Sequence, residues 1–117
     1  MQEGDIYFVE FPLSRGHEQA GLRPAIIVQA IDFEELPTVL IVPLTSKIKA
    51  SNFPFTFKIE PDKFNNLNVE SVVLIFQLRA IDQRRLKNKI GIIGQTKLAL
   101  LKQNLNCLLY TSPSPRD

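Results

Sequence analysis

Short apolar runs separated by polar turns occupy the first three quarters of the chain. Strict alternation of apolar and polar residues at 53–59 (FPFTFKI) indicates a half-buried strand. The run at 71–78 (SVVLIFQL) is almost continuously apolar and indicates a strand covered on both faces. Further strands are expected where β-branched and aromatic residues cluster, at 6–11, 25–30 and 38–44, with a weaker candidate at 89–93 that Gly91 interrupts.

The last apolar segment has a helical period. Its leucines are spaced by three, four and three residues, which places them on one face of a helix: Leu98, Leu101, Leu105 and Leu108. Thr96 is the expected N-cap. Strands in series followed by one helix predict a small antiparallel barrel or sandwich. Residues 1–109 are therefore expected to form one domain, and 110–117, which contain two prolines, a disordered or non-native tail.

Composition narrows the function classes only slightly. The 117 residues carry 14 Lys and Arg against 12 Asp and Glu, and this net charge of +2 does not by itself indicate a nucleic-acid binder. One cysteine and one histidine exclude an intrachain disulfide and a Cys/His zinc site within one chain. No apolar run approaches the roughly 20 residues of a membrane helix, and no signal pattern opens the chain, so we expect a cytoplasmic protein without membrane contact.

A polar segment at 13–24 separates the first two expected strands and is the richest in candidate chemistry. It contains Arg15, His17, Glu18, Gln19 and Arg23. Proline at 24 biases the preceding arginine to an extended backbone and so fixes where its side chain leaves the chain. A loop of this length suggests a function, but a solvated hairpin loop with incidental charges has equal weight on composition alone.

Two other segments hold polar groups at strand ends. Thr45, Ser46 and Lys47 offer hydroxyls and a cation that suit phosphate oxygens, although Ser and Thr are equally common in ordinary turns. Gln77 and Arg79 end the long apolar run, where a polar residue needs a partner or a cleft; a local pair between Arg79 and Asp82 is the simpler interpretation. The basic cluster that follows is typical of a solvated turn or of a weak phosphate attractor: Arg84, Arg85, Lys87 and Lys89.

These residue types suit one hydrolytic chemistry. The sequence has no phosphate-binding glycine loop, dinucleotide fingerprint or serine-nucleophile motif, and no carboxylate cluster for magnesium. Arginine binds phosphate through two points, and histidine, present here only as His17, is the residue type whose ordinary pKa lies near neutral pH. RNA supplies its own nucleophile, the 2′-hydroxyl, so an arginine, a hydroxyl and one acid–base group suffice for metal-free phosphodiester cleavage.

Three motifs in order and in register resemble the MazF/PemK toxin family over about residues 3–109. They are GDIY at 4–7 with GHEQAGLRP at 16–24, PLTS at 43–46, and QLRAID at 77–82. The resemblance implies a mainly β, SH3-like barrel with a C-terminal α-helix, acting as a homodimer. It also implies the toxin of a type II toxin-antitoxin system: a sequence-specific, metal- and cofactor-independent endoribonuclease. Cleavage of single-stranded mRNA would leave 2′,3′-cyclic phosphate and 5′-hydroxyl ends, and a cognate antitoxin would obstruct the RNA groove.

The resemblance also assigns roles by motif position. Arg23 is then the main catalytic cation, Thr45 bonds the scissile phosphate, and His17 assists proton transfer. The remaining motif residues and their neighbours are expected to bind RNA: Arg15, Glu18, Gln19, Ser46, Lys47, Gln77 and Arg79.

The third motif departs from the family pattern at two positions. Phe76 stands where many members carry an acid, and Leu74 where PemK-like members carry an arginine, so a mechanism through that pair does not transfer. Phe76 fits the core, or alternatively a stack on a base. Two alternatives to the ribonuclease follow: a non-catalytic barrel that binds RNA or a protein partner, and a toxin-like scaffold that acts on another target such as a topoisomerase.

Overall fold

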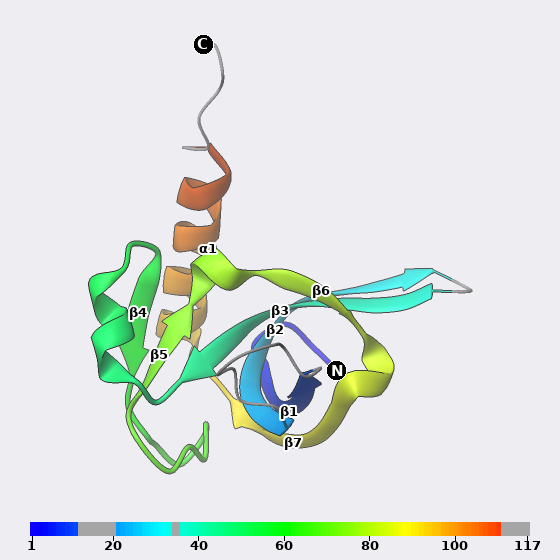
Figure 1. The fold of residues 1–117 in the computed structure, drawn as a ribbon, viewed down its shortest axis with the longest axis horizontal. Coiled ribbons are helices and arrows are strands. Elements are labelled where there is room, and N and C mark those ends of the chain that lie inside the picture. Colours follow the sequence, from blue (N-terminus) through cyan, green and yellow to red (C-terminus); the bar gives the residue numbers. More distant parts are fainter. Residues whose placement is uncertain (12–20, 34–35, 111–117) are drawn as a thin grey trace.

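The computed structural model describes residues 1–11, 21–33 and 36–110, which form an antiparallel β fold ending in one helix (Figure 1). The strands are β1 (Asp5–Phe11), β2 (Gly21–Phe33), β3 (Leu36–Thr45), β4 (Thr56–Ile59), β5 (Ser71–Leu74), β6 (Arg79–Asp82) and β7 (Leu86–Ile92). The helix α1 spans Gln95–Tyr110, and three short 3₁₀ helices are η1 (Ile48–Asn52), η2 (Ile75–Gln77) and η3 (Gln83–Arg85).

The sheet curls around itself because β3 is shared between two sets of neighbours. The hydrogen-bonded order is β4-β5-β3-β2-β1-β7, and β6 also pairs with the first half of β3. Among the described residues no ladder joins β6 to β7, and η3 spans that side instead (Figure 1). The expected small, mainly β, SH3-like barrel with a C-terminal helix is thus confirmed, with an opening between β6 and β7.

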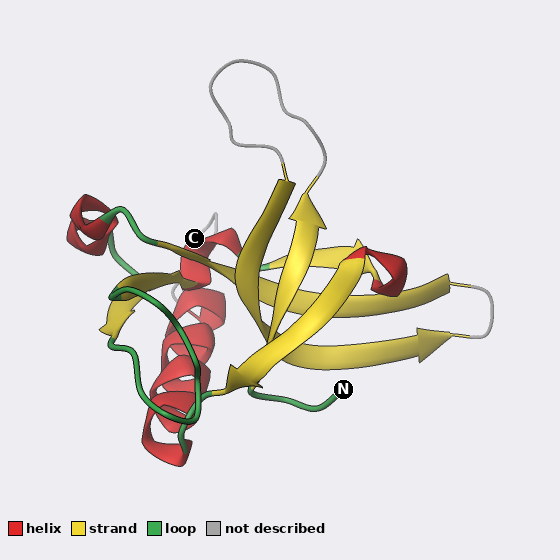
Figure 2. Ribbon diagram, turned by 90° about the horizontal axis from the view of Figure 1, so that it is seen from below, coloured by secondary structure: helices red, strands yellow, loops and turns green. Residues whose placement is uncertain are grey.

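Strands β2 and β3 are apolar on both faces because each face packs against a different core. Alternate residues of β2, such as Ala25 and Ile27, pack in the barrel interior, whereas Ile26 packs in the cluster that includes the helix leucines. Helix α1 lies along one side of the curled sheet (Figure 2). Burying each large aliphatic side chain contributes about 1.5–3 kcal/mol. The interior cluster is Val9, Phe11, Ala25, Ile27, Val39, Ile41 and Ile81; the helix-side cluster includes Ile6, Ile26, Val42, Leu44, Leu101 and Leu105.

The leucine face of the helix is confirmed, but its predicted start is wrong. Leu101 and Leu105 are buried, and the other two leucines of the face pack against the same helix-side cluster. Gly94 occupies the N-cap position, and its carbonyl oxygen accepts a hydrogen bond from Leu98 N at 2.9 Å, so Thr96 lies inside the first turn. The helix also includes Tyr110, the first residue of the predicted tail; residues 111–117 lie outside the described residues.

Two predicted strands are shorter than the hydrophobic pattern indicates. The alternation at 53–59 yields only β4, because Phe55 has a left-handed backbone (φ 59°) that takes the chain out of the sheet. The run at 71–78 ends as a strand at Leu74, where η2 begins; the four residues of β5 are buried, as a doubly covered strand requires. Strand β7 continues past Gly91 to Ile92, although its pairing with β1 shifts register between Lys89 and Gly91.

Within the described residues, no helix has the length and apolarity that crossing a membrane requires.

Candidate functional site

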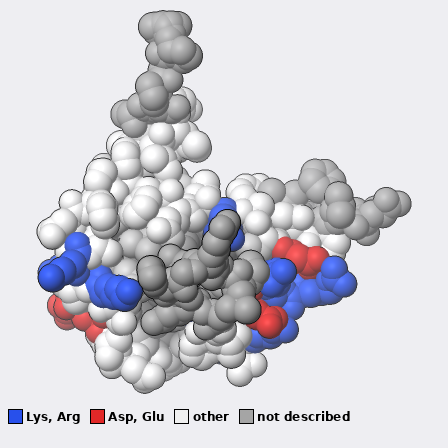
Figure 3. Space-filling view, in the orientation of Figure 1, with Lys and Arg blue, Asp and Glu red and all other residues white. Residues whose placement is uncertain are grey.

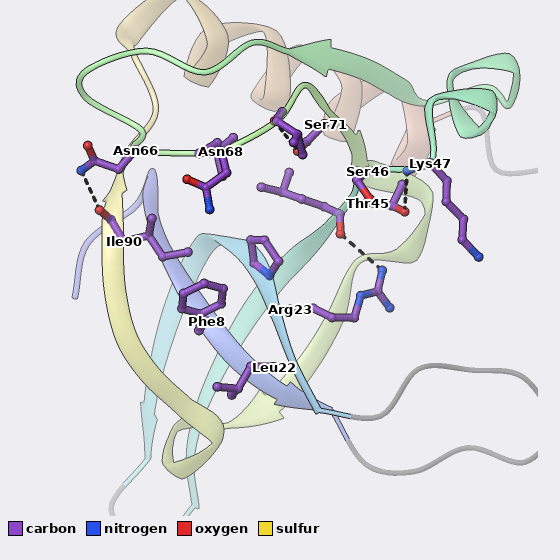
Figure 4. A pocket seen from close by; sticks show the side chains of 14 residues that line it. Phe8, Leu22, Arg23, Thr45, Ser46, Lys47, Asn66, Asn68, Ser71 and Ile90 are labelled. Atoms are coloured by element: carbon purple, nitrogen blue, oxygen red, sulfur yellow. Dashed lines mark hydrogen bonds between the residues drawn. The ribbon is translucent and has the colours of Figure 1, made fainter.

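A cleft with a volume of about 300 Å³ lies where β2 begins and β3 ends (Figure 4). One wall carries Arg23 from β2, Thr45 at the end of β3, and the two residues that follow, Ser46 and Lys47. The opposite wall is the loop between β4 and β5, and the floor is mainly apolar, with Phe8 and Ile90 among its side chains. The cleft therefore combines a wall that bears cations and hydroxyl groups with an apolar floor against which a ring can pack.

The register between β2 and β3 brings Arg23 and Thr45 together. The ladder between β2 and β3 ends where Ala25 pairs with Pro43, so Arg23 lies two residues before this end of the ladder and Thr45 two residues after it. The side chain of Arg23 reaches across, and its Nη2 donates a hydrogen bond to the Leu44 carbonyl oxygen at 3.3 Å (Figure 4). Two residues 22 positions apart in the sequence thus line one cleft.

The ring of Phe11 contacts two guanidinium groups at the mouth of the barrel. The guanidinium carbon of Arg23 lies 5.3 Å from the ring centroid, and that of Arg79 lies 5.2 Å from it. Both distances fit cation–π contacts. Phe11 is buried at the end of the interior core, so the two cations sit on a rigid support. Because arginine keeps its charge at all accessible pH values, this arrangement is suited to a phosphate.

Thr45 is held by a short turn of its own. Its Oγ1 accepts a hydrogen bond from Lys47 N at 3.2 Å (Figure 4). A hydroxyl has one donor and two acceptor positions, so this bond uses an acceptor position and leaves the O–H to donate. The same turn exposes the side chains of Ser46 and Lys47 at the rim.

The loop at 60–70 is an internally bonded unit that forms the second wall. The buried Asn65 accepts hydrogen bonds from Asp62 N and Leu67 N and donates one to Glu60 O. Asn66 then donates from Nδ2 to Ile90 O at 2.8 Å, which fixes the loop to β7 (Figure 4). Asparagine favours such local side-chain bonds. The sequence analysis missed this wall, although the asparagine-rich run at 65–68 was its signal.

The predicted site residues fall into three groups. The cleft is lined by four of them: Arg23, Thr45, Ser46 and Lys47. Arg79 contacts the ring of Phe11, as Arg23 does, and Phe11 was not among the predicted site residues. Gln77 is exposed in η2 and is not among the cleft residues. The other predicted residues lie outside the described residues: Arg15, His17, Glu18 and Gln19.

Two residues of the first motif serve the fold rather than the cleft. Gly4 has φ 93°, a left-handed conformation that a side chain would strain, and it bonds to both β2 and Ile93 through its backbone. Asp5 is buried and accepts a hydrogen bond from Gln2 N at 2.8 Å. The pair fixes where β1 begins.

The basic cluster after β6 is interleaved with carboxylates (Figure 3, right). Arg84 pairs with Asp82 at 2.8 Å, and their hydrogen bonds lower the pKa of Asp82 to about 2; the predicted pair between Asp82 and Arg79 is therefore wrong. Lys87 and Lys89 each lie 3.5 Å from a carboxylate oxygen, of Glu10 and Asp5. Arg84 and Arg85 lie in the short helix η3, whereas Lys87 and Lys89 lie in strand β7. In the described ranges, no three His, Cys, Asp or Glu side chains gather as a metal site requires.

The fold and the cleft define a class of toxin. A family model described as "PemK-like, MazF-like toxin of type II toxin-antitoxin system" matches residues 2–109, and the chain belongs to this family. Proteins named endoribonuclease MazF in Staphylococcus saprophyticus and Staphylococcus epidermidis are similar to it, with 33% and 32% identity over 99 residues. Each alignment covers 84% of this chain and 82% of the relative.

Solved structures share the fold over nearly the whole chain. MazF from Deinococcus radiodurans superposes with a TM-score of 0.69 at 27% identity, covering 94% of this chain and 96% of that one. MazF in a MazE–MazF crystal from the same organism gives a TM-score of 0.68 at 24% identity, covering 96% and 97%.

Proposed function

We propose that this toxin is an endoribonuclease that cuts single-stranded RNA, with Arg23 and Thr45 at the scissile phosphate. The observation that carries the proposal is the cleft in which β2 and β3 place these two residues on one wall. Two relatives above 30% identity carry the name endoribonuclease, which supports the same activity.

The geometry suits a reaction in which the 2′-hydroxyl of the RNA attacks the adjacent phosphate. The 2′-oxygen forms a bond to phosphorus and loses its proton, while the bond from phosphorus to the 5′-oxygen breaks and that oxygen gains a proton. Arg23 and Thr45 each donate hydrogen bonds to the phosphate oxygens on which charge develops, a role that needs no metal ion. The products are a 2′,3′-cyclic phosphate and a 5′-hydroxyl.

Other residues complete the proposed RNA site. His17 carries a proton to or from the reacting oxygens, since it is the one side chain of the sequence whose ordinary pKa lies near neutrality. Ser46, Lys47 and Arg79 bind the strand on either side of the scissile phosphate. The remaining contacts assigned to RNA are Arg15, Glu18, Gln19 and Gln77.

The toxin acts as a homodimer under the control of a cognate antitoxin. A small chain gains core by pairing with a second copy. A neighbour of this fold was solved with its cognate antitoxin, which supports such a partner here. We expect its binding segment to be acidic and apolar, complementing Arg23 and Arg79. The mRNA substrate places the toxin in the cytoplasm.

Substitution Arg23→Ala tests the assignment of the cleft. We expect cleavage of a long mixed-sequence RNA in EDTA to fall by about 10²–10³-fold or more, because a preorganised donor to the phosphorane is lost. Arg84→Ala is the matched control, since its side chain is exposed and pairs with Asp82 away from the cleft.

Three results would contradict the proposal. Undiminished cleavage by Arg23→Ala would remove the residue from the reaction, and equal losses in both variants would indicate a general charge effect. A folded native chain that binds RNA but cuts none would favour the non-catalytic barrel.

A further inference from the structure

Two exposed phenylalanines lie side by side at the edge of the molecule beyond Lys47. The rings of Phe53 and Phe76 have centroids 5.8 Å apart and are inclined by 54°. Phe53 is 58% exposed and Phe76 is 40% exposed. Burying a large aromatic side chain stabilises a fold, and these two rings lack that stabilisation. Neighbouring exposed apolar side chains are typical of a surface that binds a ligand. Phe76 is therefore not a core residue.

The backbone holds this pair in place. Phe55, with its left-handed backbone, packs its ring against the helix-side core and accepts a hydrogen bond from Ile75 N at 3.0 Å through its carbonyl oxygen. Thr56 Oγ1 donates to Phe53 O at 2.8 Å. These bonds fix the segment of one ring to the segment of the other, so the two rings form a preset surface.

The segment that carries Phe53 is rich in lysine. Residues 45–59 contain Lys47, Lys49 and Lys58 and no carboxylate. Arg79 shares β6 with Asp82, but that carboxylate pairs with Arg84. Lys or Arg side chains are visible over the η1 region, with Asp or Glu side chains directly below them (Figure 3, left). Lysine is depleted in the cores of protein–protein interfaces, whereas cations interleaved with aromatic rings are typical of single-stranded nucleic-acid sites.

The pair is also continuous with the cleft. Lys47 is the N-cap of η1 and Phe53 is its C-cap, so one short 3₁₀ helix of about 2 Å rise per residue joins the cleft to the first ring. Arg79 follows Phe76 by three residues and touches the same ring of Phe11 as Arg23. The segment of Phe53 and the segment of Phe76 are thus both connected through the chain to the candidate phosphate site.

We propose that Phe53 and Phe76 form a stacking platform for a base of the RNA strand whose scissile phosphate lies in the cleft. The inference rests on the proposed RNA substrate and adds a second binding site to it. Every base has a π face, so the platform adds affinity and aligns the strand without reading sequence.

Tryptophan fluorescence tests the platform without cleavage. The chain has no tryptophan, so Phe76→Trp introduces a single reporter at the platform. The probes are two single-stranded deoxyoligonucleotides of roughly a dozen nucleotides, one of mixed sequence and one abasic with the same backbone. We expect the mixed-sequence probe to quench the reporter and the abasic probe to leave it unchanged. Phe64→Trp is the matched control, because Phe64 is also exposed but lies beneath Lys63 and is not part of the pair.

Affinity gives the second readout. Stacking on an aromatic ring contributes enough that Phe76→Ala should bind the mixed-sequence probe about 5- to 150-fold more weakly, while Phe76→Tyr binds as the native chain does.

The outcomes separate the platform from the activity. Cleavage by the Phe76→Trp variant with equal emission changes at positions 76 and 64 would overturn the platform and leave the ribonuclease intact. Emission that depends on protein concentration without a probe would show instead that the rings join two copies of the chain. If the native chain neither binds the probe nor cuts RNA, both proposals fail.

Discussion

At the scale of single residues, the candidate site depends on neighbours that orient each group. The Leu44 carbonyl and the Phe11 ring position Arg23, and the backbone amide of Lys47 positions Thr45. Arg23 and Thr45 were predictable, because motif spacing marks them. Phe11 was not, since an aromatic residue at a strand end is indistinguishable from any other core residue in sequence.

The pair of Asp82 and Arg84 predicts a dependence on acid pH. Hydrogen bonds from the Arg84 side chain, and then from its backbone amide, lower the pKa of Asp82 from 3.8 to about 2. A carboxyl with a lowered pKa stabilises the fold above its ordinary pKa, and this stabilisation is lost as the pH falls from about 4 to 2. Carboxyl NMR titration should show the pKa of Asp82 rising toward 3.8 in Arg84→Ala and unchanged in Lys87→Ala. An unchanged value in Arg84→Ala would contradict the assignment.

At the scale of elements, hydrophobic pattern located the strands better than it located their ends. The doubly apolar runs at 25–30 and 38–44 fall within β2 and β3 because two cores share that sheet. The pattern could not show that Phe55 adopts a left-handed backbone or that η2 interrupts the run at 71–78, since both follow from packing against distant segments. The asparagine-rich run at 65–68 was a signal of a loop, but its place in the cleft wall was not predictable, because the bond from Asn66 to β7 is long-range.

A side chain at position 91 should destabilise the fold, because Gly91 lies against the loop at 60–70. A Cβ added there would lie 2.3 Å from the Phe64 carbonyl oxygen, a backbone atom that moves only with the loop. We expect Gly91→Ala to lower the free energy of unfolding by about 1–3 kcal/mol or more, measured by urea denaturation. It should also weaken RNA cleavage, because the cleft wall shifts.

Gly94→Ser is the control for this substitution. Nothing lies within 4 Å of a Cβ at Gly94, and serine is a favourable residue at an N-cap, so stability should hold or rise. Equal stability of Gly91→Ala and the native chain would show that the loop does not press on β7.

At the scale of the whole molecule, the arrangement of the charged residues indicates a binding surface, whereas the net charge does not. A balance of +2 indicates little, but the cations around η3 are paired with carboxylates, whereas residues 45–59 contain three lysines and no carboxylate. The mouth of the barrel, the cleft and the aromatic pair therefore form one positive, partly aromatic tract. The predicted residues at 15–19 lie outside the described residues and remain predictions.

A substrate lacking one 2′-hydroxyl tests the central claim most directly. Once a cleavage site is mapped, the nucleotide 5′ to the cut is replaced by its 2′-deoxy form within an otherwise identical RNA, in EDTA. Because the 2′-oxygen is the nucleophile, cleavage at that bond should stop while other sites are still cut with 2′,3′-cyclic phosphate and 5′-hydroxyl ends. Continued cleavage at the deoxy position would mean that water or a protein group attacks the phosphorus, and it would contradict the mechanism proposed for the cleft.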